Sequence, residues 1–204
     1  MERKFHAKGD YKGRTFVTYD NLNIEDFPLA HRKKTMQIGM LGNIEPRKGV
    51  LEFVKHFGEM KLPEIRLSIA GKAKDEVYSG KIKRYIIEKK LENKITIEGY
   101  VKDLNNWYNS NDCIISNSIH EGTQTSIVEG VATGCWAISK DWDGAEEIVD
   151  EKGLFTNVNE LEKCINLFYD WNVEERNKNI KEARKRLISK LTNRPKMHDI
   201  ISKL

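Results

Sequence analysis

The amino-acid sequence predicts an α/β domain built on a Rossmann-like, doubly wound parallel sheet of about six strands. From Met36 onward, short apolar runs alternate five times with amphipathic segments over about a hundred residues. The runs are apolar throughout, as strands buried on both faces of a parallel sheet require. The chain has 204 residues, 39% of them hydrophobic, which is enough for one buried core with C-terminal helices added to it.

The strands are expected at the apolar runs, in residues 36–41, 65–70, 95–97, 113–116, 135–139 and 153–156. Apolar residues at helical spacing predict a helix after five of these six strands. The patterns are Val50, Leu51, Phe53, Val54 and Phe57; Ile82, Tyr85 and Ile86; Leu104, Trp107 and Tyr108; Ile127, Val128 and Val131; and Leu161, Cys164, Ile165 and Phe168. The fourth helix should begin near residues 123–125 and end at Gly134, and the fifth should cover 158–171.

Three regions follow from this pattern. Residues 1–35 are predicted to be an N-terminal connector with one strand-like segment at 14–21, and residues 36–171 the domain itself. Residues 172–204 form a basic helical tail with ten Lys and Arg against four Asp and Glu, although the whole chain carries only +4. The tail has an apolar stripe of Ile180, Ala183, Leu187, Ile188 and Leu191, and Pro195 ends its helix. We expect the tail to pack on or near the domain; attachment to an anionic membrane surface is the alternative.

Composition excludes several classes of protein. No apolar run approaches the roughly 20 residues that span a bilayer, and the N-terminus lacks the apolar segment of a signal peptide. We therefore expect a cytoplasmic protein, at most peripheral at the inner membrane face. Cys113, Cys135 and Cys164 lack metal-ligand spacing and are interpreted as reduced core thiols. A dinucleotide enzyme is disfavoured because no Gly-x-Gly-x-x-Gly follows the first strand, and a nucleic-acid role would rest on the basic tail alone.

The loop after the first strand reads "GNIEPRKG" (42–49) and carries two cations at a predicted helix start. Gly42 permits a tight turn and Pro46 stiffens the loop, while Arg47 and Lys48 lie beside the positive end of a helix dipole. Such an arrangement suits a phosphate. A solvated basic turn is the competing interpretation.

The loop after the fourth strand continues into "HEGTQTSIVEG" (120–130), in which Glu121 and Glu129 bracket small polar residues. Glu121 should lie just before the helix and Glu129 one turn inside it, where each carboxylate can accept hydrogen bonds from a pair of hydroxyls. The N–H groups of residues 122–124 can hold an anion, so a sugar and a phosphate together fit this segment. The alternative is that Glu121 caps the helix dipole and Glu129 is merely exposed.

These loops together resemble the C-terminal, donor-binding domain of the retaining GT-B glycosyltransferases, in the group 1, family 4 type that includes sucrose synthase and bacterial mannosyltransferases. "GNIEPRKGV" (42–50) resembles the family's Gly-Arg-Leu-x-x-x-Lys-Gly loop, and residues 95–122 its strand, Gly-x-Val turn and Glu-Gly segment. "EGTQTSIVEGVATGCWAIS" (121–139) is similar to its Glu-x7-Glu signature, "DGAEEIV" (143–149) to its Gly-Gly-x-x-Glu-Ile turn, and "YDNLNIEDF" (19–27) to its entering linker. The likeness covers about residues 15–170, and several ordered motifs are more specific than any one.

The resemblance implies a role for each matching residue. Lys48 would neutralise the donor diphosphate, Glu129 would hold the ribose hydroxyls, and Glu121 would contact the transferred sugar. The amides of residues 122–125 would bind the distal phosphate, and the turn at 99–101 would lie near the base. The implied donor-binding residues are Gly42, Asn43, Lys48, Gly71, Tyr100, Val101, Glu121, Gly122, Thr123, Gln124, Thr125 and Glu129, with Lys48, Glu121 and Arg47 taking part in catalysis.

One departure from the family pattern concerns charge, because Asn43 stands where the family has Arg. Either Arg47 reaches in from four positions on, or donor binding and leaving-group stabilisation are weaker. Two other motifs compete for a chemical role. The Asp-Trp-Asp at 141–143 is similar to a metal motif of other glycosyltransferases, and His120 could act as a base or merely orient or pack. Trp107 and Tyr108 are interpreted as core residues rather than a sugar-stacking platform.

The activity implied by the resemblance is transfer of a sugar, with retention of configuration and without a metal or other cofactor, to a glycan or lipid acceptor. A UDP-sugar donor is favoured over a GDP-sugar. Only about 35 residues precede the domain, so we expect an N-terminal GT-B domain or a partner subunit to supply the acceptor site, and the isolated chain to be inactive. The alternative is a non-catalytic nucleotide-sugar-binding module or one subunit of a split enzyme.

Overall fold

The computed structural model describes residues 24–29, 34–62, 64–122 and 124–192, and these contain a single six-stranded sheet. All its strand pairs are parallel, in the order β3-β2-β1-β4-β5-β6. The strands are β1 (Gln37–Leu41), β2 (Arg66–Ala70), β3 (Ile95–Gly99), β4 (Cys113–Ser116), β5 (Trp136–Lys140) and β6 (Leu154–Phe155). The predicted fold class is therefore confirmed, with every strand within two residues of its expected position.

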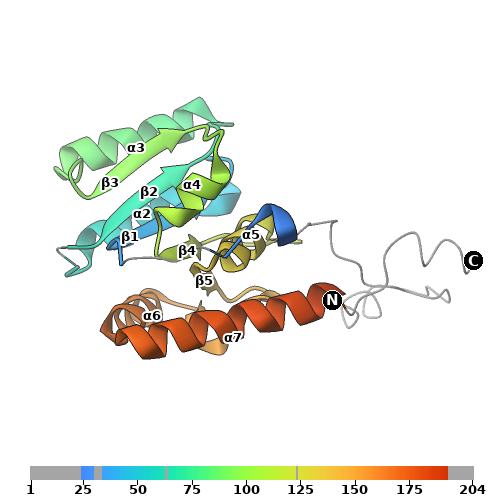
Figure 1. The fold of residues 1–204 in the computed structure, drawn as a ribbon. Coiled ribbons are helices and arrows are strands. Elements are labelled where there is room, and N and C mark those ends of the chain that lie inside the picture. Colours follow the sequence, from blue (N-terminus) through green and yellow to red (C-terminus); the bar gives the residue numbers. More distant parts are fainter. Residues whose placement is uncertain (1–23, 30–33, 63, 123, 193–204) are drawn as a thin grey trace, which may run out of the picture.

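Helices connect the first five strands in turn, and two further helices follow the last strand. They are α2 (Val50–Glu59), α3 (Glu76–Glu88), α4 (Leu104–Asn109), α5 (Thr125–Thr133), α6 (Val158–Asp170) and α7 (Val173–Thr192). Helix α2 packs on α3, while α4 packs on α5 and α5 on α7. Figure 1 shows β3 and α3 at one end of the molecule and α6 and α7 at the other. Because strand order reverses at β1 and crossovers are right-handed, α2 and α3 cover one face and α5 the other.

The core consists of the apolar residues that define the sequence pattern. Trp107 and Tyr108 are both buried, as predicted, and so are the three cysteines, which form no disulfide with one another. Helix α5 ends where Gly134 adopts a left-handed conformation with φ of 92°, which confirms the expected end of that helix. The strand-like segment at 14–21 and Pro195 lie outside the described residues.

The basic tail begins with α7, which the structure places against the domain. Ala183 and Leu187 of its apolar stripe are buried. Arg184 Nε donates a 2.8 Å hydrogen bond to the carbonyl of Ala132 in α5, and Arg186 pairs with Asp150 at 3.0 Å. None of the described helices combines the length and apolarity needed to cross a bilayer.

Candidate functional site

The two loops singled out in the sequence meet at one edge of the sheet, beyond the carboxyl ends of β1 and β4. These strands are neighbours, and the strand order reverses between them. The crevice at such a reversal is where open α/β sheets bind their ligands. Hydrogen bonds tie the loops together: Ile119 N donates to the carbonyl of Arg47 at 3.1 Å, and Asn117 Nδ2 to the carbonyl of Gly49 at 2.8 Å.

Gly49 is required for this close approach. It adopts a left-handed conformation with φ of 61°, and a Cβ there would lie 2.5 Å from the carbonyl oxygen of Asn117. Arg47 and Lys48 lie in the short 3₁₀ turn η2 (Pro46–Lys48), and Gly49 separates this turn from α2. Both cations therefore stand directly before α2, at the helix start that the sequence predicted, in a short turn of their own.

Lys48, Arg47 and Glu121 form a charged cluster across the two loops. Lys48 Nζ lies 2.5 Å from Glu121 Oε1, and Arg47 Nη1 lies 3.3 Å from Glu121 Oε2. Arg47 also donates to the carbonyl of His120 at 3.1 Å and pairs with Glu45 at 3.0 Å. The side chain of Glu121 is only 7% exposed, whereas that of Arg47 is 50% exposed. Glu121 therefore holds both cations within reach of a shared ligand.

The cluster sets the ionisation of Glu121. Burial raises the pKa of the Glu121 carboxyl, but hydrogen bonds from Lys48 and Ser118 and the charges of Lys48 and Arg47 outweigh it. The pKa is therefore lowered, and the carboxylate is charged at neutral pH. The result is a site with two cations and one buried anion, in which the anion already has hydrogen-bond donors.

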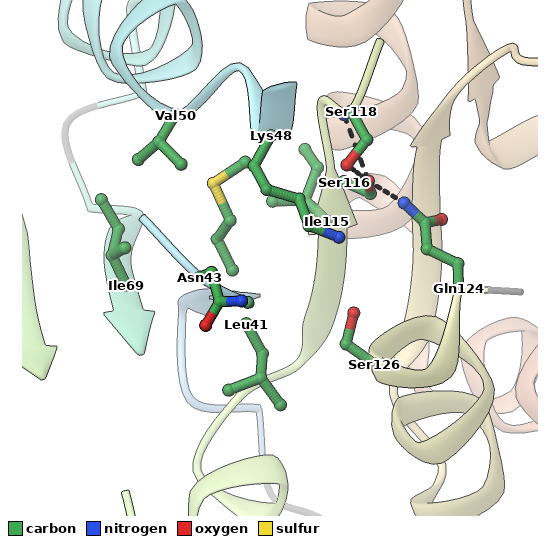
Figure 2. A pocket seen from close by; sticks show the side chains of 12 residues that line it. Leu41, Asn43, Lys48, Val50, Ile69, Ile115, Ser116, Ser118, Gln124 and Ser126 are labelled. Carbon is green, nitrogen blue, oxygen red and sulfur yellow. Dashed lines mark hydrogen bonds between the residues drawn. The ribbon is translucent and has the colours of Figure 1, made fainter. Parts of the chain in front are cut away.

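A small pocket adjoins the cluster and is lined from β1, β4 and the start of α5. Figure 2 shows Lys48, Asn43 and Ser126 around it, with Gln124 beside Ser116. Gln124 is buried; its amide donates to the hydroxyl of Ser116, and its carbonyl oxygen accepts from Ser139 at 3.4 Å. Its side chain therefore fixes the floor of the pocket. Asn43, where the family has Arg, is exposed and uncharged.

The structure brings together some of the predicted residues and not others. The pocket is lined by four of them, Gly42, Asn43, Lys48 and Gln124. Glu121 is joined to this lining by its ion pair with Lys48, and Arg47 by its ion pair with Glu121. Gly71 serves packing, because a Cβ on it would lie 1.8 Å from the carbonyl oxygen of Gly42. Tyr100, Val101, Gly122, Thr125 and Glu129 do not line this pocket, and Thr123 lies outside the described residues.

The turn after β3 presents an exposed aromatic ring. Tyr100 is 65% exposed, and Lys72 Nζ lies 4.8 Å from its ring centroid. Gly71 N donates a 2.7 Å hydrogen bond to the carbonyl of Gly99, so this turn is tied to the loop after β2. The predicted base-binding turn thus lies at the same edge of the sheet as the pocket, because all the strands are parallel.

Glu129 is half-buried rather than fully exposed, and it has a partner that sequence reasoning missed. Tyr108 in α4 donates a 2.7 Å hydrogen bond from its hydroxyl to Glu129 Oε2. Burial raises the pKa of Glu129, and the Tyr108 hydrogen bond lowers it by less, so the pKa stays above its ordinary value. The interpretation of Glu129 as a merely exposed surface residue is therefore wrong.

Sequence reasoning also missed the hydroxyls at the end of β4. Ser116 and Ser118 are buried, line the pocket and hydrogen-bond each other at 3.2 Å. The signal was available, because "SNS" directly follows an apolar strand in the loop that the sheet edge predicts to be functional. The Asp-Trp-Asp at 141–143 has a buried Trp142, and within the described ranges no group of three or more His, Cys, Asp or Glu is placed to hold a metal. The side chain of His120 is exposed.

The sheet order, with a ligand crevice at the strand reversal, defines a Rossmann-like α/β domain, and comparison with known proteins gives the family. Residues 23–186 match the model of the family described as glycosyl transferases group 1. The chain belongs to this family. The match spans the whole sheet and most of the α7 helix, so it includes both loops of the site.

Individual proteins are similar to the chain in sequence or in fold. The poly(glycerol-phosphate) alpha-glucosyltransferase of Bacillus subtilis (strain 168) is 29% identical over 115 residues, which cover 55% of this chain and 17% of that protein. Anabaena HepE in complex with UDP and glucose superposes with a TM-score of 0.81 at 18% identity, covering 98% of this chain and 60% of HepE. A variant of Staphylococcus aureus TarM in complex with fondaparinux, alpha-GlcNAc-glycerol and UDP gives 0.78 at 18% identity, covering 98% of this chain and 40% of TarM. The chain therefore spans less than two thirds of each of these proteins.

Proposed function

We propose that the chain is the donor-binding half of a retaining glycosyltransferase of the family 4 type and that its donor is a UDP-sugar. The observation that carries the proposal is the cluster of Lys48, Arg47 and Glu121 at the strand reversal. Two cations suit a diphosphate, and a carboxylate suits sugar hydroxyls. UDP in the HepE and TarM complexes supports the choice of base.

The proposed mechanism depends on charge at the leaving group. As the bond between the anomeric carbon and the diphosphate oxygen breaks, negative charge develops on that oxygen, and Lys48 and Arg47 stabilise it. The acceptor hydroxyl attacks the anomeric carbon from the same face, and its proton goes to the departing phosphate. Glu121 and Glu129 then act as binding groups and not as the acid/base pair of a hydrolase.

Arg47 is proposed to supply the charge that Asn43 lacks. Its guanidinium already reaches across to Glu121 and the carbonyl of His120 from the loop after β1. In the donor-free chain both cations pair with Glu121, so an incoming diphosphate competes with that carboxylate for them. We propose that this exchange frees Glu121 for the sugar hydroxyls.

The reaction is proposed to need no metal, because Lys48 and Arg47 provide the positive charge. Calorimetric titration of the chain with UDP in the presence and absence of EDTA tests this point. We expect the same dissociation constant in both. A loss of binding with EDTA that Mg²⁺ or Mn²⁺ restores would contradict metal independence.

The acceptor is proposed to be a glycan or lipid that binds on a second half, in the same polypeptide or in a partner, with the isolated chain inactive. The Bacillus subtilis relative, a poly(glycerol-phosphate) alpha-glucosyltransferase, supports transfer to an acceptor other than a free sugar. Transfer of glucose from UDP-glucose that appears only when an acceptor-binding half is added would support the proposal. Binding without transfer in every combination would favour a non-catalytic module.

A cytoplasmic location, with the basic tail touching the inner membrane face, stays a prediction. Exposed Lys178, Lys181 and Lys185 lie along α7 and could contact anionic lipid. Co-sedimentation with phosphatidylglycerol vesicles that falls as salt rises would support contact. Equal recovery with neutral vesicles would argue against it.

Calorimetry with UDP, GDP and ADP tests the donor site. We expect UDP to bind most tightly and Lys48→Ala and Glu129→Ala each to weaken it by about 1.5–3 kcal/mol, the size of a hydrogen bond to a charged group. Lys83→Ala is the matched control, because Lys83 is exposed on α3 and lies outside the pocket. If none of the three nucleotides binds the wild-type chain, the assignment of a donor site is wrong.

A further inference from the structure

We propose that Tyr108 is a positioning residue for Glu129, so that recognition of the donor's ribose hydroxyls depends on the short helix α4. This inference rests on the proposed function, because it takes Glu129 as the residue that meets the ribose. Tyr108 itself is placed in the core and does not touch the ligand.

The contact between the two side chains is short and comes from different elements. The hydroxyl of Tyr108 lies 2.7 Å from Glu129 Oε2 and 3.2 Å from the carbonyl oxygen of Ser126. Tyr108 lies in α4, whereas Ser126 and Glu129 belong to successive turns of α5. The bond therefore fixes one oxygen of the half-buried carboxylate relative to α5, and the other oxygen, Oε1, is the one that the proposal assigns to the ligand.

The direction of the bond follows from the ionisation of the phenol. Burial raises the pKa of the Tyr108 hydroxyl far above its usual value, and the charge of Glu129 raises it further. Tyr108 therefore keeps its proton and donates it, while Glu129 accepts. A donated hydrogen bond holds a carboxylate in place without removing its charge, which the ribose contact needs.

The ring of Tyr108 is itself held on several sides. It is fully buried, with the ring of Phe27 at 6.3 Å and that of Trp107 at 5.4 Å, both edge to face. Trp107 Nε1 in turn donates to the hydroxyl of Ser68 in β2 at 3.0 Å. A side chain with so little freedom is suited to orienting another. A residue that only satisfied its own hydroxyl would give the same bond, so the two roles must be separated by experiment.

The experiment compares UDP with 2′,3′-dideoxyuridine diphosphate on the full chain and on its Tyr108→Phe variant, by calorimetry. Phe keeps the ring and its contacts, and circular dichroism checks that the variant is folded. We expect the variant to bind UDP about fivefold to tenfold more weakly and the dideoxy nucleotide within about twofold of wild type. If the variant loses affinity equally for the two ligands, Tyr108 has only a structural role. If it loses affinity for neither, the inference is also wrong.

Two further measurements make the test specific. In a double-mutant cycle, Tyr108→Phe should add nothing to the loss caused by Glu129→Gln, and additive losses would contradict the inference. The dissociation constant of UDP from the variant, divided by that from wild type, should grow as pH falls. Burial raises the pKa of Glu129 and the hydrogen bond from Tyr108 lowers it. The variant lacks that bond, so its Glu129 takes up a proton at a higher pH than Glu129 of wild type. The ligand's own phosphate ionisation cancels in that ratio, so a pH-independent ratio would contradict positioning.

Tyr85→Phe is the matched control, because Tyr85 is a half-buried tyrosine in the last turn of α3 and lies in neither α4 nor α5. It should leave the binding of both ligands unchanged. The outcome also separates this inference from the function on which it rests. If wild type fails to bind UDP, both fail. If wild type binds UDP and Tyr108→Phe binds it equally well, only the role of Tyr108 fails.

Discussion

Glu121 and Glu129 stand eight positions apart, yet their surroundings move their pKa values in opposite directions. Burial acts on both, but Glu121 has Lys48, Arg47 and Ser118 to offset it, whereas Glu129 has only the Tyr108 hydroxyl. A carboxyl whose pKa is lowered by folding stabilises the fold when charged, and one whose pKa is raised destabilises it. The two glutamates should therefore contribute to stability with opposite signs.

Glu121→Gln should destabilise the chain at neutral pH. The folded-state pKa of Glu121 lies below its ordinary 4.5, so its contribution is fully present above that value and is lost as pH falls through the folded pKa. Removing the charge leaves Lys48 without its ion-pair partner and should cost about 1–3 kcal/mol. Thermal unfolding across the pH range measures the gap between variant and wild type. A gap that does not narrow at all as pH falls below 4.5 would show that packing, and not charge, is lost.

Glu129→Gln should instead stabilise the chain at neutral pH, although it weakens UDP binding. The folded-state pKa of Glu129 lies above its ordinary 4.5, so the cost of burying the charge appears as pH rises through the folded pKa. Gln removes the charge and keeps an oxygen for Tyr108, which should raise stability by up to about 1 kcal/mol. The gap should close in acid, where wild type is neutral. A lower midpoint than wild type at about pH 8 would contradict the sign.

At this scale the sequence predicted the charged residues better than their partners. Lys48, Glu121 and Glu129 were identifiable because family motifs place them, and the first two do meet in space. The Tyr108–Glu129 bond was not, because Tyr108 follows the same apolar spacing as its neighbours and is buried like them. A hydroxyl that reaches a carboxylate on another helix leaves no trace in the spacing of either segment.

Helix α5 carries Glu129, and its distance from β4 is set by a glycine. A Cβ on Gly130 would lie 2.5 Å from Ile114 Cγ1, and Ile114 is a fully buried residue of β4. This close contact explains why a glycine stands within the helix despite its low helix propensity. Gly122 shows no such reason, because nothing lies within 4 Å of a Cβ there.

Gly130→Ala should therefore push α5 away from the sheet. The extra methyl group overpacks a full core, which should cost about 1–3 kcal/mol despite the better helix propensity of Ala. UDP binding should weaken as well, because Glu129 moves with the helix. Chemical denaturation and calorimetry measure the two effects.

Gly80→Ala is the control for this change, because Gly80 lies exposed in α3 with nothing within 4 Å of a Cβ. Here only helix propensity acts, so stability should rise by about 0.8–1 kcal/mol. Equal and positive changes at the two glycines would mean that Ile114 accommodates the methyl group and that α5 does not depend on a close contact.

At the scale of elements, periodicity predicted the strands and helices, but not the turn that places Arg47 and Lys48. Apolar spacing locates buried faces: four of the five residues that it selected in α2 are buried, and Leu51 is partly buried. The 3₁₀ turn η2 has no buried residue, so no apolar period marks it. Its end depends on the left-handed Gly49, whose need appears only when Asn117 packs against it.

The whole molecule depends on α7, the basic helix that sequence reasoning assigned either to packing or to a membrane. Its buried residues face α5, which stands over the site, and Arg184 caps the carbonyl of Ala132 near the end of that helix. We propose that α7 is part of the domain's core and supports the position of α5. Its exposed lysines are then free for another surface, so the two assignments do not exclude each other.

Leu187→Ala tests this support, because Leu187 is only 1% exposed and removing its side chain leaves a cavity under α7. Loss of buried methyl groups of this kind costs about 2–5 kcal/mol. Lys181→Ala is the matched control on an exposed position of the same helix and should change stability by less than about 0.5 kcal/mol. Chemical denaturation measures the stability of both variants. Vesicle binding should fall for Lys181→Ala, which removes an exposed positive charge, and should stay unchanged for folded Leu187→Ala. A small stability change at Leu187 would show that α7 is only loosely attached, and that its place on α5 does not hold the site together.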